Sequence, residues 1–236
     1  MSRYTISPQQ FFSHCCQGEF ILGFFIAFEG PEGSGKTTQM HLLAEYLYEQ
    51  GYAPLITREP GGTRIGDRVR AILLDPLHEE MAPTTEFLLF SASRAQHVRQ
   101  VIGPHLAQDG IVLCDRFAYS SLAYQGYGYE LDLKVLRHIT EFATGGLMPD
   151  LSFYLDLPVE IGLRRKSGGE GDDWNRMEQK GIDYHQRVRR GYLEMTAQEP
   201  DRWAVVDATA SLSAIQAVIR SVIEERGLLH TGRRVG

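Results

Sequence analysis

The feature that most constrains this chain is the stretch Gly30–Thr37, with the sequence GPEGSGKT, which matches the pattern G-x-x-x-x-G-K-[ST]. Glycines at these positions let backbone N–H groups turn toward one anion, and a helix that begins here points its positive end at the same place. An apolar run at 23–28 precedes the stretch, and apolar residues recur at helical spacing over 42–47. The strand before and the helix after that the motif requires are therefore both expected. The stretch predicts binding of a nucleoside triphosphate.

Two side chains of this loop are expected to act directly on the bound nucleotide. Lys36 can reach the outer phosphates, and the hydroxyl of Thr37 can ligate Mg²⁺. A second metal ligand is expected at Asp115, because the apolar strand 111–115 ends there and P-loop proteins place an acidic residue at that point. The expected ATP-binding set is the loop and the residue after it: Gly30, Pro31, Glu32, Gly33, Ser34, Gly35, Lys36, Thr37 and Thr38.

The composition of the chain excludes several classes of protein. It has 236 residues, 43% hydrophobic and 23% charged, which is typical of one globular α/β domain. A net charge of −6 argues against a nucleic-acid surface. Three cysteines, two of them adjacent, form neither a disulfide framework nor a metal set. No apolar segment approaches the roughly 20 residues that span a bilayer. We therefore expect a cytoplasmic protein with neither nucleic acid nor a membrane as partner.

Apolar runs and helical patterns alternate along the chain. Strands are expected at 23–28, 53–57, 111–115, 151–157 and 203–206. Helices are expected after the phosphate loop, around 65–73, and at 84–107, from 158 onward, at 182–198 and at 212–225. This alternation predicts an α/β fold with a parallel sheet that carries helices on both faces. The polar, glycine-rich segment 167–175 has no apolar period and is expected to be mobile.

Six segments stand in the order found in bacterial thymidylate kinases. They are FEGPEG (28–33), TREPGGT (57–63), LFSASR (89–94), DRF (115–117), SSLAYQG (120–126) and NRME (175–178). The chain thus resembles bacterial thymidylate kinases, of the P-loop nucleoside monophosphate kinase family, over residues 24–226. Many NTPases share the phosphate loop, whereas TREPGGT and SSLAYQG are far more specific.

The resemblance implies both an activity and an organisation. It implies transfer of the ATP γ-phosphoryl group to dTMP, giving dTDP in dTTP biosynthesis, with Mg²⁺ as cofactor. It also implies a five-stranded parallel sheet, a small mobile lid at about 165–180, and a homodimer. We expect an N-terminal appendage at 1–23, a kinase-like domain at 24–226 and a C-terminal tail at 227–236.

Phosphoryl transfer needs cations around two phosphates, and the predicted strand ends supply them. Arg58 and Arg116 each stand at the end of a predicted strand and are expected to clamp the acceptor phosphate, since guanidinium groups bind phosphate oxygens in pairs. With Lys36, Arg116 is expected to be catalytic. The alternative for either arginine is a surface ion pair.

Base recognition is expected to depend on four residues: Phe90, Arg94, Ser121 and Gln125. Phe90 offers a flat face for a pyrimidine, and Arg94, one helical turn away, is within reach of a base carbonyl. The alternatives are core packing for Phe90 and a solvated helix face for Arg94. The resemblance places Tyr124 where a ribose 2′-hydroxyl would lie and Glu32 opposite the deoxyribose 3′-hydroxyl. A solvated carboxylate is the alternative for Glu32.

Two departures from the family pattern concern basic residues. After Tyr124-Gln125-Gly126 the pattern usually continues to an arginine, but 127–130 supplies none. The lid usually carries an arginine before the Asn/Asp-Arg pair, but 167–175 has only acidic charge. Some thymidylate kinases have an arginine at the position of Gly33, so a cation is expected from elsewhere. We favour Arg176 as this catalytic residue over the near-side residues Arg165 and Lys166.

Two other functions remain open at this point. One is a kinase for another nucleoside monophosphate, and the other is a non-catalytic P-loop switch that controls a partner. The N-K-x-D motif of guanine-specific switches is absent, and the arginines outside the phosphate loop favour a second phosphorylated substrate.

Overall fold

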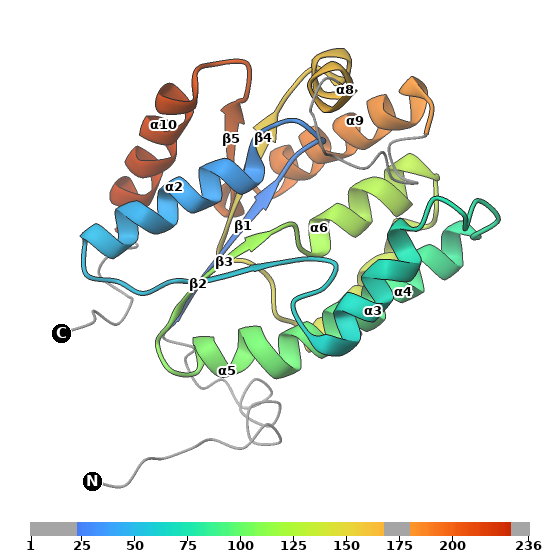
Figure 1. Ribbon diagram of the computed structural model, residues 1–236, viewed down its shortest axis with the longest axis horizontal. Coiled ribbons are helices and arrows are strands. Elements are labelled where there is room, and N and C mark those ends of the chain that lie inside the picture. Colours follow the sequence, from blue (N-terminus) through green and yellow to red (C-terminus); the bar gives the residue numbers. More distant parts are fainter. Residues whose placement is uncertain (1–22, 168–179, 228–236) are drawn as a thin grey trace, which may run out of the picture.

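A computed structural model describes residues 23–167 and 180–227 of the chain (Figure 1). The elements are β1 (Phe24–Glu29), α2 (Lys36–Glu49), β2 (Leu55–Arg58), α3 (Arg64–Leu74), α4 (Pro83–His97), the π-helical η1 (Val98–Ile102), α5 (Gly103–Leu106), β3 (Ile111–Asp115), α6 (Ala118–Ser121), the π-helical η2 (Leu122–Gly128), α7 (Leu133–Thr144), β4 (Leu151–Asp156), α8 (Val159–Ser167), α9 (Ile182–Gln198), the 3₁₀ turn η3 (Pro200–Arg202), β5 (Trp203–Asp207) and α10 (Leu212–Glu225). Among the helices of these two ranges, none is both long and apolar enough to cross a bilayer.

The sheet has five strands in the order β2-β3-β1-β4-β5, and all neighbouring strands pair in parallel. This confirms the predicted five-stranded parallel sheet. The central strand β1 leads into the phosphate loop, and its Phe28 pairs with Asp115 of β3. Arg58 of β2 pairs with the same Asp115. The carboxyl ends of β1, β2 and β3 therefore meet at one edge, where parallel α/β sheets bind their ligands.

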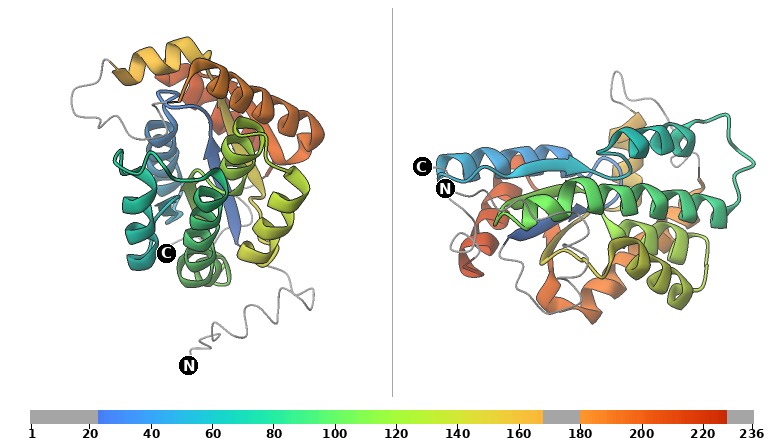
Figure 2. Two further views of the ribbon diagram at one scale, coloured as in Figure 1. Left: turned by 90° about the vertical axis from the view of Figure 1, so that its right-hand side faces the viewer. Right: turned by 90° about the horizontal axis from the view of Figure 1, so that it is seen from below.

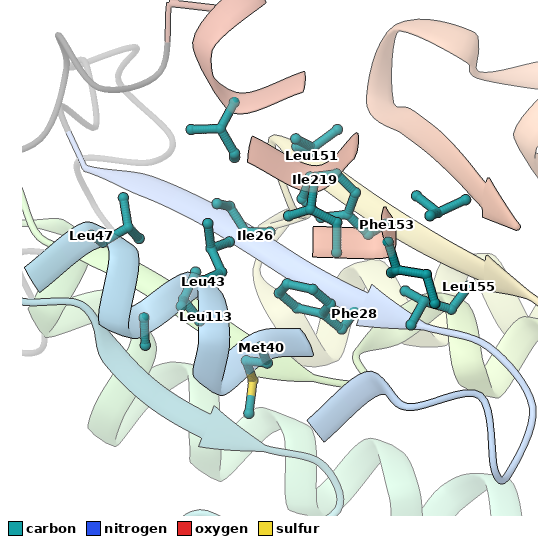
Figure 3. Close-up of a cluster of buried hydrophobic side chains, with 14 of the residues drawn as sticks. Ile26, Phe28, Met40, Leu43, Leu47, Leu113, Leu151, Phe153, Leu155 and Ile219 are labelled. Carbon is teal, nitrogen blue, oxygen red and sulfur yellow. The ribbon is translucent and has the colours of Figure 1, made fainter. Parts of the chain in front are cut away.

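Alternate side chains of β1 build the cores on the two faces of the sheet, because successive residues of a strand point to opposite sides. Ile26 and Phe28 belong to a cluster that also contains apolar residues of α2 and α10 (Figure 3). Phe25 and Ala27 belong to a second cluster, with residues of η1, α5 and α6. Figures 1 and 2 show α2 and α10 on one side of the sheet and α5 on the other. Both faces are covered, as predicted.

The helix expected at 84–107 is present as one unbroken helical run over 83–106, although its hydrogen-bond pattern changes in the middle. It consists of α4, the π-helical η1 and the short α5. Pro104 favours a π-helical turn here, because it has no N–H to donate to the carbonyl four residues earlier. Sequence reasoning also missed α7, although Asp132 caps its start by accepting from Lys134 N at 2.8 Å and Gly145 ends it in a left-handed conformation.

Candidate active site

The phosphate loop is held in a conformation that only glycine adopts easily. Gly30 has φ of 145°, and a Cβ there would lie 2.7 Å from the carbonyl oxygen of Leu155. The helix α2 begins at Lys36, so its first N–H groups open into the loop. Thr37 and Thr38 begin α2 with exposed side chains, whereas Ser34 is buried. The loop thus lies between a strand and the start of a helix, as its sequence predicts.

Lys36 is buried beneath this loop, and its Nζ donates to the carbonyl of Pro31 at 2.8 Å. Burial lowers the pKa of Lys36, and the nearby Arg116 lowers it further, while Glu32 and Asp115 oppose the shift. These influences show that one charged cluster includes the phosphate loop and the end of β3. A negatively charged ligand in the loop would stabilise the lysine in its protonated form.

The two predicted metal ligands are brought together. The hydroxyl of Thr37 donates a short hydrogen bond to Oδ2 of Asp115. In the described ranges, no group of three or more histidine, cysteine, aspartate and glutamate side chains could hold a metal. Mg²⁺ in phosphate-transferring sites typically takes only one or two protein oxygen ligands and completes its shell with phosphate and water. The oxygens of Thr37 and Asp115 fit that requirement.

Arg116 connects the phosphate loop to the segment that carries Tyr124. Its Nη2 donates to Oε1 of Glu32 at 2.5 Å and to the hydroxyl of Tyr124 at 3.1 Å. Its guanidinium also lies over the Tyr124 ring, 5.0 Å from the centroid. Burial acts to lower the pKa of Arg116, but Glu32, Tyr124, Tyr192 and Glu29 together more than offset it and raise the pKa well above its ordinary value. Three residues predicted separately therefore form one cluster.

Sequence reasoning missed a buried carboxylate, Glu29, which holds the backbone that follows Arg116. Arg116 is one of the described non-glycine residues with positive φ, at 68°. The next N–H, of Phe117, donates to Glu29 Oε1 at 2.9 Å, and the hydroxyls of Ser120 and Tyr192 donate to Glu29 Oε2 at 2.6 and 2.7 Å. Burial raises the pKa of Glu29, and these hydrogen bonds oppose the rise. A glutamate ending an otherwise apolar strand directly before the loop was the available signal.

Arg58 and a further arginine, Arg70, lie near the carboxyl end of β2. The Arg58 side chain is 57% exposed, and its Nη2 is 3.7 Å from Asp67 Oδ1, so the surface ion pair considered as its alternative is formed. Arg70, on α3, donates to the carbonyl of Pro60 at 3.1 Å. Burial and then the charge of Arg58 lower the pKa of Arg70, whereas Asp115 and Glu32 oppose the shift. Sequence reasoning missed Arg70; its signal was a basic residue on the helix that follows TREPGGT.

The predicted base-reading residues come from two facing segments. Phe90 is half-buried on α4, and Arg94, one turn later, is 1% exposed, which excludes a solvated helix face for Arg94. Arg94 Nε donates to Glu59 at 2.8 Å, and Nη2 donates to Ser121 at 3.0 Å. Gln125, also buried, donates from Nε2 to Glu86 Oε1 at 2.7 Å. Glu59 and Glu86 were not expected here.

Comparison with known proteins identifies the family. A family model described as thymidylate kinase matches residues 28–219. The thymidylate kinase of Roseiflexus castenholzii is 54% identical over 214 residues, covering 86% of this chain and 93% of that protein. The thymidylate kinase of Deinococcus radiodurans is 50% identical over 205 residues, covering 87% and 98%.

A solved structure agrees with these relatives. The crystal structure of thymidylate kinase from Ehrlichia chaffeensis superimposes with a TM-score of 0.69 at 32% identity, covering 86% of this chain and 98% of that one. The chain belongs to the thymidylate kinase family. Thymidylate kinases phosphorylate dTMP to dTDP, so this chain is a phosphotransferase of nucleotide biosynthesis that acts on dTMP.

Basic side chains of the described residues lie beside the segment 127–130 and beside the phosphate loop. Arg187 of α9 donates from Nε and Nη2 to the carbonyl of Gly128, at 3.0 and 2.8 Å, in the segment that lacks the usual arginine. Lys180 lies 5.2 Å from the centroid of the Tyr129 ring. Arg165 of α8 donates to the carbonyls of Gly33 and Ala208 at 3.3 and 3.2 Å. The expected catalytic residue Arg176 lies outside the described residues, as does most of the predicted lid.

His185 of α9 is a buried residue near the cluster that sequence reasoning also missed. Its Nε2 finds no hydrogen-bond partner in the part of the chain that the structure describes. Burial lowers the pKa of His185, while Glu32 acts to raise it, which places the ring within electrostatic reach of the loop carboxylate. A lone histidine on a helix gave no usable signal in the sequence.

Proposed function

We propose that ATP and dTMP bind on either side of the Arg116–Glu32 pair and exchange the γ-phosphoryl group across it. The observation that carries this proposal is the continuity of the site. Glu32 belongs to the phosphate loop, Tyr124 belongs to the segment that also provides Ser121 and Gln125, and Arg116 contacts both Glu32 and Tyr124. A kinase that transfers phosphate between two nucleotides needs such adjacent sites, because the reacting atoms must be aligned closely.

On the donor side, the backbone of residues 30–38 holds the ATP phosphates and Lys36 neutralises the outer ones. Lys36 exchanges its present bond to the Pro31 carbonyl for phosphate oxygens. Thr37 and Asp115 hold Mg²⁺, which supplies positive charge to the phosphate oxygens when bound. These roles are supported by the loop conformation and by the contact between the Thr37 and Asp115 side chains.

On the acceptor side, Arg58, Arg70 and Arg116 bind the 5′-phosphate of dTMP. Arg116 carries the central charge, because it lies nearest to the donor loop and remains protonated at all working pH values. When it turns to the phosphate, Glu32 accepts a hydrogen bond from the sugar 3′-hydroxyl. The Tyr124 ring occupies the space beside the sugar and disfavours a 2′-hydroxyl.

The thymine base lies against Phe90, with its polar edge toward Arg94, Ser121 and Gln125. Arg94 donates to the O4 carbonyl, and Gln125 accepts from the N3–H group. We expect dTMP to be preferred, dUMP to be weaker and the ribonucleotide TMP to be weaker still. The 5-methyl group fills apolar space worth about 1–3 kcal/mol, so discrimination against dUMP is modest.

Arg176 supplies the remaining transition-state charge from the lid. In support, Arg165, one of the two near-side alternatives, is engaged with the carbonyls of Gly33 and Ala208. The lid spans about 165–180 within a kinase domain at 24–226, with separate segments at 1–23 and 227–236. The enzyme acts in the cytoplasm.

The protein also functions as a homodimer. Large apolar side chains are exposed on the neighbouring helices α3 and α4, including Ile65, Ile72 and Leu88, at 52%, 44% and 49%. Exposed apolar surface of this kind favours association with a second copy. Sedimentation of the wild type and of Leu88→Glu tests this: a dimer in the first and a monomer in the second are expected, and a monomeric wild type contradicts it.

A panel of nucleoside monophosphates, assayed for ATP consumption with Mg²⁺, tests the function. The expected order of kcat/KM is dTMP above dUMP, with CMP, GMP and AMP far lower. Comparable values for dTMP and CMP would contradict the proposed recognition of thymine. Binding of ATP without turnover of any monophosphate would favour a non-catalytic switch.

A further inference from the structure

Arg94 and Gln125, the two residues proposed to hydrogen-bond O4 and N3 of the base, are each bonded to a buried carboxylate. Glu59 accepts from Arg94 Nε at 2.8 Å, and Glu86 accepts from Gln125 Nε2 at 2.7 Å. Glu59 is 4% exposed and Glu86 is 0% exposed. With these bonds made, Arg94 Nη1 and Gln125 Oε1 still have no hydrogen-bond partner among the residues described.

These two atoms differ in character, because a guanidinium nitrogen only donates and an amide oxygen only accepts. Thymine presents a carbonyl at position 4 beside an N3–H group, which suits one donor and one acceptor. Cytosine presents an amino group at position 4 beside an unprotonated N3. In the same pose, cytosine would place donor against donor at Arg94 and acceptor against acceptor at Gln125. The discrimination at N3 therefore depends on which end of the Gln125 amide faces the base.

The glutamine cannot determine this by itself. A half-turn of the amide exchanges its oxygen and nitrogen with almost no change of shape. An ionised carboxylate at Glu86 only accepts, so the NH₂ group must turn toward it and the oxygen must turn away. The Tyr129 hydroxyl donates to the second oxygen, Glu86 Oε2, at 3.2 Å, and helps to hold the carboxylate in place.

The arrangement along the helix is consistent with this role. Glu86, Phe90 and Arg94 are spaced by four residues on α4 and so lie on one face of the helix. Ser121 and Gln125 are likewise four residues apart on the facing segment. Arg94 bonds Ser121 and Glu86 bonds Gln125, so Phe90 lies between the two contacts along its helix.

We propose that Glu86 is a positioning residue that fixes the Gln125 amide with its oxygen toward the base and thereby excludes 4-aminopyrimidine nucleotides. The proposal rests on the proposed function, in which the base edge lies against Arg94 and Gln125. Glu86 acts through Gln125 and does not contact the substrate.

The test is the substitution Glu86→Gln, with kcat/KM measured for dTMP and for dCMP. An amide at position 86 can donate as well as accept, so the Gln125 amide is free to turn. The ratio of the dTMP value to the dCMP value should fall about tenfold or more, because the site no longer opposes cytosine N3 with a fixed acceptor. The change should appear mainly in KM for dCMP, with KM for ATP unchanged.

Asp150→Asn is a matched acid-to-amide control. Asp150 accepts from the Phe25 N–H at 2.8 Å and precedes β4, at the opposite edge of the sheet from the site. Its ratio of dTMP to dCMP should equal that of the wild type. If Glu86→Gln does not fold, Glu86→Asp keeps the charge but withdraws the carboxylate from Gln125, and the ratio should fall there too.

A folded Glu86 variant that keeps the wild-type ratio overturns the proposal. Equal losses for dTMP and dCMP also overturn it, because they indicate a merely structural role. A wild-type enzyme that uses dCMP as well as dTMP overturns the proposed recognition of thymine as well. The two failures are thus distinguished by whether the wild type itself prefers dTMP.

Discussion

The donor side and the base side of this site are built in different ways. The phosphate loop consists of consecutive residues between β1 and α2. It is expected to bind the ATP phosphates mainly through its backbone N–H groups. The base side uses side chains from separate elements, such as Arg94 with Glu59, 35 residues apart, and Gln125 with Glu86, 39 residues apart. A backbone site thus carries its own sequence signature, whereas a side-chain site depends on pairings that form only in the folded chain.

The largest expected effect tests whether the donor side, which binds through its backbone, also needs a side chain for catalysis. Arg176→Ala should lower kcat by about 10³–10⁵, because it removes a cation from the spreading negative charge of the transition state. The dissociation constants of ATP and dTMP should change far less. Single-turnover kinetics and equilibrium titration separate the two. If kcat survives in this variant and collapses in Arg165→Ala or Lys166→Ala, the near flank of the lid supplies the charge.

The next prediction distinguishes the base side from the donor side by which substrate binds more weakly. Arg94→Ala should raise KM for dTMP by a factor that corresponds to about 1.5–3 kcal/mol, the range for a hydrogen bond to a charged group. ATP affinity should remain nearly intact, which isothermal titration can check. Parallel losses of ATP and dTMP affinity would mean that Arg94 supports the fold and does not read the base.

A smaller effect tests the backbone character of the donor side. Gly30→Ala should lower the free energy of unfolding by about 1–3 kcal/mol and weaken ATP binding, since alanine adopts a φ of 145° only with strain. Thermal unfolding and ATP titration measure this. Gly181→Ala is the control, because a Cβ there meets no atom within 4 Å and stability should hold. Wild-type stability and ATP affinity in Gly30→Ala would contradict the need for glycine in the loop.

The smallest effect probes one neutral contact on the base side. Ser121→Ala removes the hydroxyl that accepts from Arg94 Nη2 at 3.0 Å. KM for dTMP should rise by an amount equivalent to about 0.5–1.5 kcal/mol, the net value of an ordinary hydrogen bond. Steady-state kinetics at saturating ATP suffice. A loss as large as that of Arg94→Ala would show that Ser121 contacts the substrate directly.

The sequence was sufficient for the sheet, the loop and the side chains that end its strands. Alternating strand and helix patterns predicted parallel strands, and in the folded sheet Arg58 and Asp115 pair at one edge. Local patterns are enough for such features, because the carboxyl ends of parallel strands must meet. The π-helical turn within the expected helix was not predicted, although Pro104 was the available signal for it.

The supporting carboxylates could not be predicted in the same way. Glu59 and Glu86 have ordinary positions in the sequence, and only tertiary packing shows that both are buried against Arg94 and Gln125. Glu29 is likewise buried, and it accepts a hydrogen bond from the N–H of Phe117, the residue after Arg116. Buried polar groups require partners, but the sequence does not say which partners they find.

The ion pair between Glu32 and Arg116 has a consequence for how the two substrates affect each other. Glu32 belongs to the donor loop, and Arg116 is expected to turn toward the acceptor phosphate, so the arrival of dTMP changes the charge beside ATP. The binding free energies of the two nucleotides are then coupled, and thermodynamic linkage requires the coupling to be equal in both directions. Whatever factor dTMP applies to the dissociation constant of ATP, ATP must apply to that of dTMP.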